Sequence, residues 1–360
     1  MRGKKNIDTT LRKLRISRII LPICIGISVV CYLFWSHFDI QAFKSIDWGY
    51  QVFAWLLLGV LFYVIRHLAY SYRLFILSDK KLSLRKSAEL IFIWEFATTI
   101  SPTSLGGSAV AMIFLSLERL KTARAVTIVL YTIVLDTFFF VVSVPLLLTI
   151  LGLNVIRPEI FTWDDMNGYG ITFFIVFAIM LTYGFIFYYG LFHRPDQIKK
   201  LMAFFARRRI LRRYKEKLIQ TGQDIENSSR RLRAKSPDLH IKAILATFTA
   251  WIFKFALMFC IIYAFIDTVP RTLYHTFMIY GRYETMWAIT AASPTPGGSG
   301  LAEYLFGGFY SDYVPLSLAV VVAFTWRIIA YYTYLMAGVI IVPAWIRKIY
   351  NRKKSVNLGE

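Results

Sequence analysis

The chain has 360 residues, of which 57% are hydrophobic and 17% aromatic, and its mean hydropathy is +0.53. A soluble protein of this size carries more polar surface, so the composition excludes that class. A formal charge of +21 is typical of nucleic-acid binding, but these basic residues lie between long apolar runs and therefore indicate membrane topology.

Apolar runs that approach or exceed the ~20 residues needed to cross a bilayer recur along the chain. The first of them, 16–38, is long for a signal peptide and is followed by no small-residue cleavage site, so we expect a retained span. We predict an all-α polytopic membrane protein with six full spans, at about 16–38, 50–77, 122–152, 168–192, 241–266 and 315–346.

Two further apolar regions, 88–118 and 273–311, are broken in the middle by similar stretches, SPTSLGGS and SPTPGGSG. Pro and Gly at this density end a helix, because they remove a donor and favour non-helical dihedrals. Each limb is then too short to cross comfortably, which predicts a re-entrant hairpin. Two unrelated glycine turns, or a pair of kinked helices, are the alternative.

Lys and Arg predict opposite orientations for the two hairpins. The N-terminal 18 residues and both flanks of the first hairpin are basic, so these segments should be cytoplasmic. The flanks of the second hairpin contain a single basic residue, Arg271, so this hairpin should enter from outside. Six crossings then place both termini in the cytoplasm.

Opposed hairpins with related sequences indicate an inverted repeat within one transmembrane domain, 1–360. Repeat one would span about 50–152 and repeat two about 241–346. Between them, segment 195–236 is strongly basic and has apolar residues at helical spacing. We expect a cytoplasmic amphipathic helix on anionic lipid headgroups. Nucleic-acid contact is the alternative, but topology already explains the charge, so no nucleic-acid partner is expected.

The two turns predict a polar cavity, since irregular backbone at membrane depth must be satisfied by protein or water. The limb after each Gly-Gly-Ser should begin a helix, whose N-terminus suits an anion such as a lipid phosphate. Alternatively, the hydroxyl groups only satisfy nearby backbone. The candidate lipid-binding residues are Ser101, Thr103, Gly106, Gly107 and Ser108, then Pro294, Thr295, Pro296, Gly297, Gly298, Ser299 and Gly300, with Glu303 and Arg327.

Charged side chains within apolar segments need partners, because an unpaired charge at a helix centre costs about 2.5–3.5 kcal/mol. We expect the acids Glu95, Asp136 and Glu303 to neutralise Lys254 and Arg327 in one interior network, or to form separate structural ion pairs. Five more lie nearer predicted span ends, where snorkelling to the interface explains them: Arg66, His67, Arg73, Arg282 and Glu284.

No enzyme motif is found. The five histidines are scattered without metal-ligand spacing, and the three cysteines lie inside apolar runs. There is neither a phosphate-binding Gly-Lys-Ser/Thr loop nor a nucleophile elbow. We therefore assign no catalytic residue, metal or cofactor, and whether the chain is an enzyme stays open.

The second turn, residues 294–300 with Glu303 following, resembles a signature of the membrane region of bacterial lysylphosphatidylglycerol synthases and their stand-alone flippase-like relatives. Further matches are Arg73 within Tyr-Arg-Leu, Asp136, and Arg327 with Gly338. The resemblance implies a protein of the bacterial cytoplasmic membrane, related to units that move aminoacylated phospholipid between leaflets, without the soluble transferase domain.

The first turn departs from the family pattern. There the family commonly has an acidic residue and an Arg, whereas residues 108–112 here read Ser-Ala-Val-Ala-Met. Substrate contacts at those positions cannot be carried over.

Three hypotheses follow. The first is translocation of an anionic or aminoacylated phospholipid, or another lipid-linked substrate, between leaflets. The second is a membrane-embedded transferase or an accessory subunit in phospholipid or glycan modification. The third is secondary transport of a small anion. A missing lipid species in cells without the protein would favour synthesis, and an altered leaflet distribution would favour transport.

Overall fold

The computed structural model describes residues 40–44, 46–101, 104–118, 120–166, 168–197, 200, 204, 215–291, 293, 295–298 and 300–358. This part of the chain contains helices and no strand, which confirms the all-α class. The predicted first span, 16–38, lies outside the described residues.

Five helical stretches in the described part are long and apolar enough to cross a membrane, and they match five of the six predicted spans within a few residues. The fifth stretch is continuous through two helices joined by a π-helical turn, η5. The stretches are α4 (Tyr50–Leu77), α7 (Thr122–Leu151), α8 (Gly168–Tyr188) with its π-helical end η2 (Tyr189–His193), α11 (Pro237–Phe265), and α14 (Leu316–Arg327) with η5 (Ile328–Tyr332) and α15 (Thr333–Leu358).

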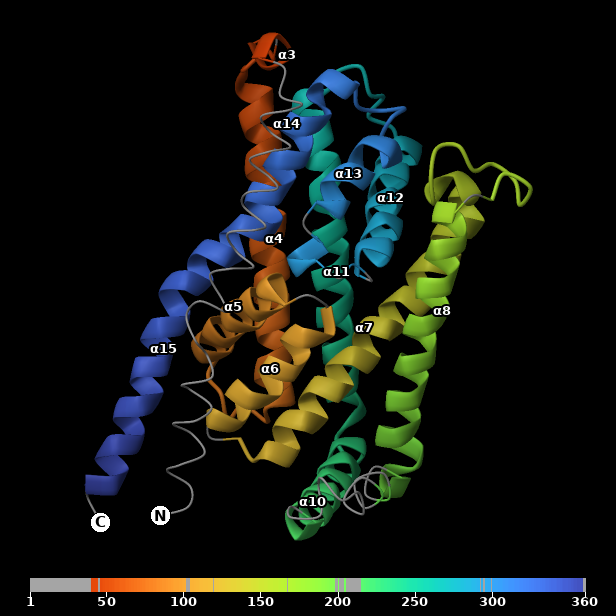
Figure 1. Ribbon diagram of the computed structural model, residues 1–360. Coiled ribbons are helices and arrows are strands. Elements are labelled where there is room, and N and C mark those ends of the chain that lie inside the picture. Colours follow the sequence, from red (N-terminus) through yellow and green to blue (C-terminus); the bar gives the residue numbers. More distant parts are fainter. Residues whose placement is uncertain are drawn as a thin grey trace.

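Both Gly-rich stretches break the helix, and in each broken segment the two helices pack against each other. The first consists of α5 (Leu84–Ile100) and α6 (Ser104–Leu117), and the second of α12 (Leu273–Ala291) and α13 (Leu301–Phe309). The two pairs lie toward opposite ends of the bundle, with α5 and α6 at the end that holds α10 (Figure 1).

The second break has the form expected from its glycines. Positive φ angles at Gly297 (56°), Gly298 (68°) and Gly300 (85°) need residues without a Cβ. A short turn, Pro296–Gly298, precedes α13, which begins immediately after Gly300.

At the first break, the prediction that the second limb starts after Gly-Gly-Ser is wrong. Helix α6 begins at Ser104, so Gly106 and Gly107 lie in its first turns. Their role is close packing: a Cβ added at Gly107 would collide with Thr98, and one at Gly106 would lie 2.6 Å from the Ser101 Cβ. These glycines therefore let α5 and α6 approach closely.

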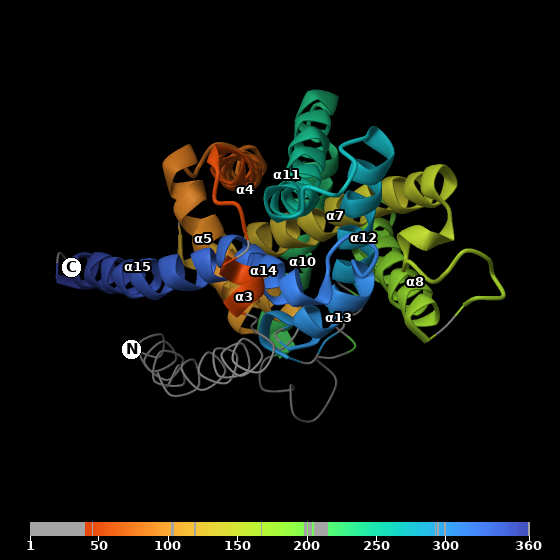
Figure 2. The same cartoon turned by 90° about the horizontal axis from the view of Figure 1, so that it is seen from above.

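Helices α4 and α11 run side by side along one face of the bundle, and α8 and α15 lie on opposite outer sides (Figure 2). The largest core cluster joins α11 to α12 and α7 through aromatic residues, including Phe140, Trp251 and Phe255. This packing supports the walls of the cavity described below.

The basic segment contains α10 (Lys215–Arg233), whose apolar Ile225 and Leu232 are buried. The helix packs on α7 and η2, so part of its apolar face contacts protein. Most of residues 198–214, where the other apolar positions fall, lie outside the described part of the chain.

Candidate functional site

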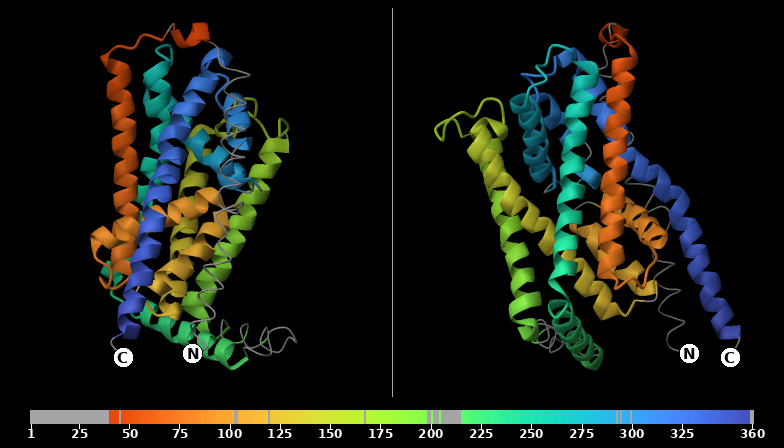
Figure 3. Two further views of the ribbon diagram at one scale, coloured as in Figure 1. Left: turned by 60° about the vertical axis from the view of Figure 1, so that its left-hand side comes forward. Right: turned by 180° about the vertical axis from the view of Figure 1, so that it is seen from behind.

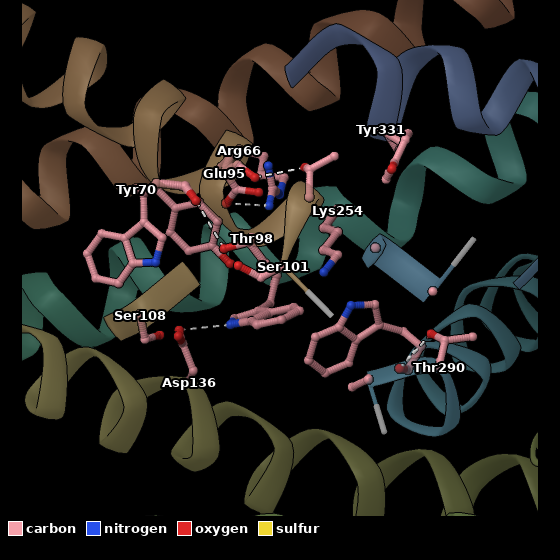
Figure 4. A pocket seen from close by; sticks show the side chains of 18 of the residues that line it. Arg66, Tyr70, Glu95, Thr98, Ser101, Ser108, Asp136, Lys254, Thr290 and Tyr331 are labelled. Atoms are coloured by element: carbon pink, nitrogen blue, oxygen red, sulfur yellow. Dashed lines mark hydrogen bonds and ion pairs between the residues drawn. The ribbon is translucent and has the colours of Figure 1, made fainter. Parts of the chain in front are cut away.

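A cavity of about 270 Å³ lies between the two broken segments. Polar residues of both line it, including Thr98, Ser101 and Ser108 from the first and Thr290 and Ser293 from the second (Figure 4). Side chains of α4, α7, α8, α11 and α14 complete the walls. We call this space the central cavity.

The breaks themselves are neighbours. A Cβ added at Gly297 would lie 3.2 Å from the carbonyl oxygen of Thr99 and would collide with Tyr331. The tightest part of the second turn therefore packs directly against the end of α5.

Arg66 on α4 forms the first ion pair at the cavity. Its Nη2 donates to Oε1 of Glu95 on α5 at 2.9 Å, and its Nη1 donates to the Tyr334 hydroxyl at 2.8 Å. The guanidinium also lies over the rings of Tyr63 and Tyr70, at 4.8 and 4.9 Å. Arg66 is only 3% exposed, so an acid partner is essential to offset its desolvation.

Arg73, two helical turns further along α4, forms the second pair. Its Nη1 donates to Oδ1 of Asp136 on α7 at 2.6 Å and to the Thr247 hydroxyl at 2.9 Å. The indole N–H of Trp251 donates to the same carboxylate oxygen at 3.0 Å. Asp136 thus connects α4, α7 and α11.

Arg327 and Glu303 form the third pair and fix the second turn. Arg327 Nε donates to Glu303 Oε1 at 2.7 Å, and its Nη1 and Nη2 donate to the carbonyls of Gly297 and Gly298. The backbone N–H of Gly300 donates to the other Glu303 oxygen at 2.7 Å. Glu303 therefore occupies the α13 N-terminus, the position that the sequence assigned to an anionic ligand.

Lys254 on α11 is different, because no acid or hydrogen-bond acceptor pairs with it within the described residues. Its ammonium lies 4.2 Å from the ring centres of both Trp251 and Trp287. It lines the central cavity between Ser101 and Thr290 (Figure 4). The three cavity arginines each pair with an acid, so Lys254 is the basic group of the cavity lining that has no acid partner among the described residues.

The cavity hydroxyl groups mostly bond to their own helices. Thr98, Thr99 and Ser101 each donate to the carbonyl four residues earlier, and Thr290 donates to the Trp287 carbonyl. With their hydrogens engaged, they offer lone pairs to the cavity. Lys254, in contrast, carries N–H donors on the cavity wall.

The snorkelling interpretation is wrong for the five residues placed near span ends, because all of them are buried. Tyr63, Arg66, Tyr70 and Arg73 are three or four residues apart and so share one face of α4. This spacing could have predicted that Arg66 and Arg73 face the interior. Arg282 lies away from the cavity, where it bonds to Asp312 and to the carbonyls of Asn154 and Phe309.

Some of the remaining predicted site residues line the cavity and others do not. Thr295, Gly297, Gly298 and Arg327 line the cavity, whereas Glu303 supports it from behind Arg327. Thr103, Pro294 and Ser299 lie outside the described residues. No three His, Cys, Asp or Glu side chains in the described part gather into a group that could hold a metal ion.

The family model of the lysylphosphatidylglycerol synthase TM region matches residues 19–338. The chain belongs to this family. This confirms the resemblance seen in the sequence and, with the apolar helices, identifies an integral membrane protein. A UPF0104 membrane protein of Archaeoglobus fulgidus is 26% identical over 303 residues, which cover 80% of this chain and 86% of that relative. No solved structure matches the chain.

Proposed function

We propose that this protein moves a phospholipid with a negatively charged headgroup between the leaflets of a bacterial cytoplasmic membrane. The headgroup enters the central cavity while its acyl chains stay in the bilayer. Membership of the lysylphosphatidylglycerol synthase TM family supports a role in lipid biology. The polar and charged side chains that line part of the cavity, inside a bundle of apolar helices, support a headgroup as its occupant.

Lys254 is the observation that carries this proposal. An unpaired charge at a helix centre costs about 2.5–3.5 kcal/mol, and each cation–π contact contributes about 0.5–2 kcal/mol. The two indole rings can therefore hold the ammonium without an acid. On its cavity side the ammonium has no acceptor among the described residues, and a lipid phosphate is the anion that fits this position.

The topology proposed from the sequence fits this function. Helices α5 and α6 would enter from the cytoplasm, and α12 and α13 from outside, within two inverted repeats. Their placement toward opposite ends of the bundle supports this arrangement (Figure 3). The exposed Arg230, Arg231 and Arg233 of α10 would then contact anionic headgroups at the cytoplasmic surface.

The test is leaflet exchange in vesicles that contain the purified protein and one labelled lipid at a time. Phosphatidylglycerol, an aminoacylated phosphatidylglycerol and phosphatidylcholine would be compared, with uptake of inorganic phosphate as a separate assay. We expect Lys254→Gln to slow exchange of the preferred lipid at least tenfold, because an ion contact near 4 Å is worth about 4 kcal/mol at an effective dielectric of about 20.

Lys254→Arg should retain part of this activity, because it keeps the charge. Lys242→Gln is the matched control, since Lys242 lies on the same helix but is half-exposed and paired with Asp238. Equal exchange by the parent and Lys254→Gln for every lipid would refute the proposal. Phosphate uptake without lipid exchange would instead identify a transporter of small anions.

A further inference from the structure

Helices α7 and α12 meet along an antiparallel line of contacts, which we call the α7–α12 seam. A Cβ added at Gly281 would lie 3.4 Å from Leu147. One turn along, Ser143 Oγ donates to Glu284 Oε2 at 2.8 Å. One turn further, Phe140 stacks on Trp287, with ring centres 5.1 Å apart and planes 5° apart.

Glu284, in the middle of this seam, is a buried carboxyl group that has no counter-charge in the described part of the chain. It is 0% exposed, and none of the described residues forms a hydrogen bond with its Oε1. Glu95, Asp136 and Glu303 each pair with an arginine, but no charged residue of α7, α8, α11, α12 or α13 pairs with Glu284 in the described part of the chain.

Among the described residues, the one titratable group in electrostatic contact with Glu284 is Tyr280, one turn earlier on α12. A tyrosine hydroxyl provides no positive charge. Taking a carboxylate into a dry, unpaired site costs several kcal/mol, and such a group keeps its proton instead. The closed seam therefore holds Glu284 as the neutral acid.

The seam connects this acid to the cavity. Trp287 lies one turn beyond Glu284 on α12, and its ring covers the Lys254 ammonium at 4.2 Å. Phe140, its stacking partner on α7, also lines the central cavity. Any separation of α7 from α12 at Glu284 moves the aromatic surface that holds Lys254.

We propose that Glu284 is a proton-binding site through which proton movement drives opening of the α7–α12 seam, and thus of the central cavity. In the closed seam the carboxyl keeps its proton. When water enters, the carboxyl releases the proton to water, and the hydrated carboxylate keeps the seam open until a proton returns. This inference rests on the proposed lipid movement for its purpose, but proton binding itself can be measured separately.

The first test needs no transport. Thermal stability of the purified protein would be measured between about pH 5 and pH 8. The parent should lose stability as the pH rises, since the carboxylate is compatible with the open or unfolded chain but not with the closed seam. Glu284→Gln and Glu284→Leu replace the acid by neutral side chains and should remove this loss. Either variant suffices if the other does not fold.

Ser143→Ala is the matched control, because it removes the hydrogen bond, worth about 1 kcal/mol, but keeps the carboxyl group. It should lower stability at every pH and retain the parent's pH response. A parent with the same pH response as a folded Glu284 variant would overturn the proposal.

The second test uses vesicles with a pH gradient. The parent's lipid exchange should change severalfold with the direction of the gradient, whereas exchange by Glu284→Gln should not respond. An equal response in both would also overturn coupling through Glu284. If the parent moves no lipid at all, the proposed function fails, while the stability test still decides whether Glu284 binds a proton in this range.

Discussion

Substitution of Glu303 distinguishes a structural from a substrate-binding role for the second turn. Glu303→Ala removes the acceptor of two hydrogen bonds, from Gly300 N–H and Arg327 Nε, both at 2.7 Å. It also leaves the buried Arg327 without its acid partner. Breaking a buried pair in this way costs about 3–5 kcal/mol.

Since about 1 kcal/mol corresponds to roughly 2 °C for a protein larger than 150 residues, the melting temperature should fall by about 6–10 °C. Tryptophan fluorescence during heating in detergent would measure it. Glu303→Ala with Arg327→Met should be more stable than Glu303→Ala alone, because no buried charge remains unpaired. A Glu303→Ala variant with the parent's stability but no lipid exchange would refute this reasoning and identify Glu303 as a substrate ligand.

Two further predictions concern the first broken segment. Gly107→Ala should lower the free energy of unfolding by about 1–3 kcal/mol, because the added Cβ collides with α5. Gly307→Ala is the control: its added Cβ meets open space, so it should stabilise α13 by up to about 1 kcal/mol. Changes in melting temperature of the same sign for both variants would contradict the close contact at Gly107. At Glu118, after α6, burial alone raises the pKa, but hydrogen bonds from Lys86 and two α15 residues outweigh it and hold the pKa below its usual range. The ionised Glu118 therefore stabilises the folded protein at pH values above the pKa of an unfolded glutamate, about 4.3. This stabilisation is lost as the pH falls through the lower pKa that Glu118 has in the folded protein. Glu118→Gln should therefore have a lower melting temperature than the parent at neutral pH, and the two melting temperatures should converge in acid. A difference that is the same at every pH would contradict this role of Glu118.

The sequence predicts the long helices and the breaks because both depend on local properties. A continuous apolar run such as 50–77 has few ways to satisfy its backbone in lipid other than as a helix. A cluster of Pro and Gly such as residues 294–300 predicts a turn from the residue types alone, and the structure shows the positive φ angles there, at Gly297 for example. The start of α6 was misplaced because Gly106 and Gly107 serve helix contact instead of helix termination.

The charge partners could not be derived in the same way, because they depend on which faces of distant helices meet. The sequence suggested that Glu95 and Asp136 neutralise Lys254, but Arg66 and Arg73 take both acids. Distance from the predicted ends of α4 was a poor guide, since a tilted and packed helix can bury residues near its ends. The face shared by Tyr63, Arg66, Tyr70 and Arg73 was the better signal.

The solitary Lys254 has a consequence for how cargo preference can change within such a framework. Each cavity arginine is tied to an acid on another helix, so replacing one member strands a charge and endangers the fold. Within the described residues, replacement of Lys254 leaves no acid without its partner. Under the proposed function, a single codon at this position would set the charge that faces the headgroup, and an acid there would favour a cationic cargo over an anionic one.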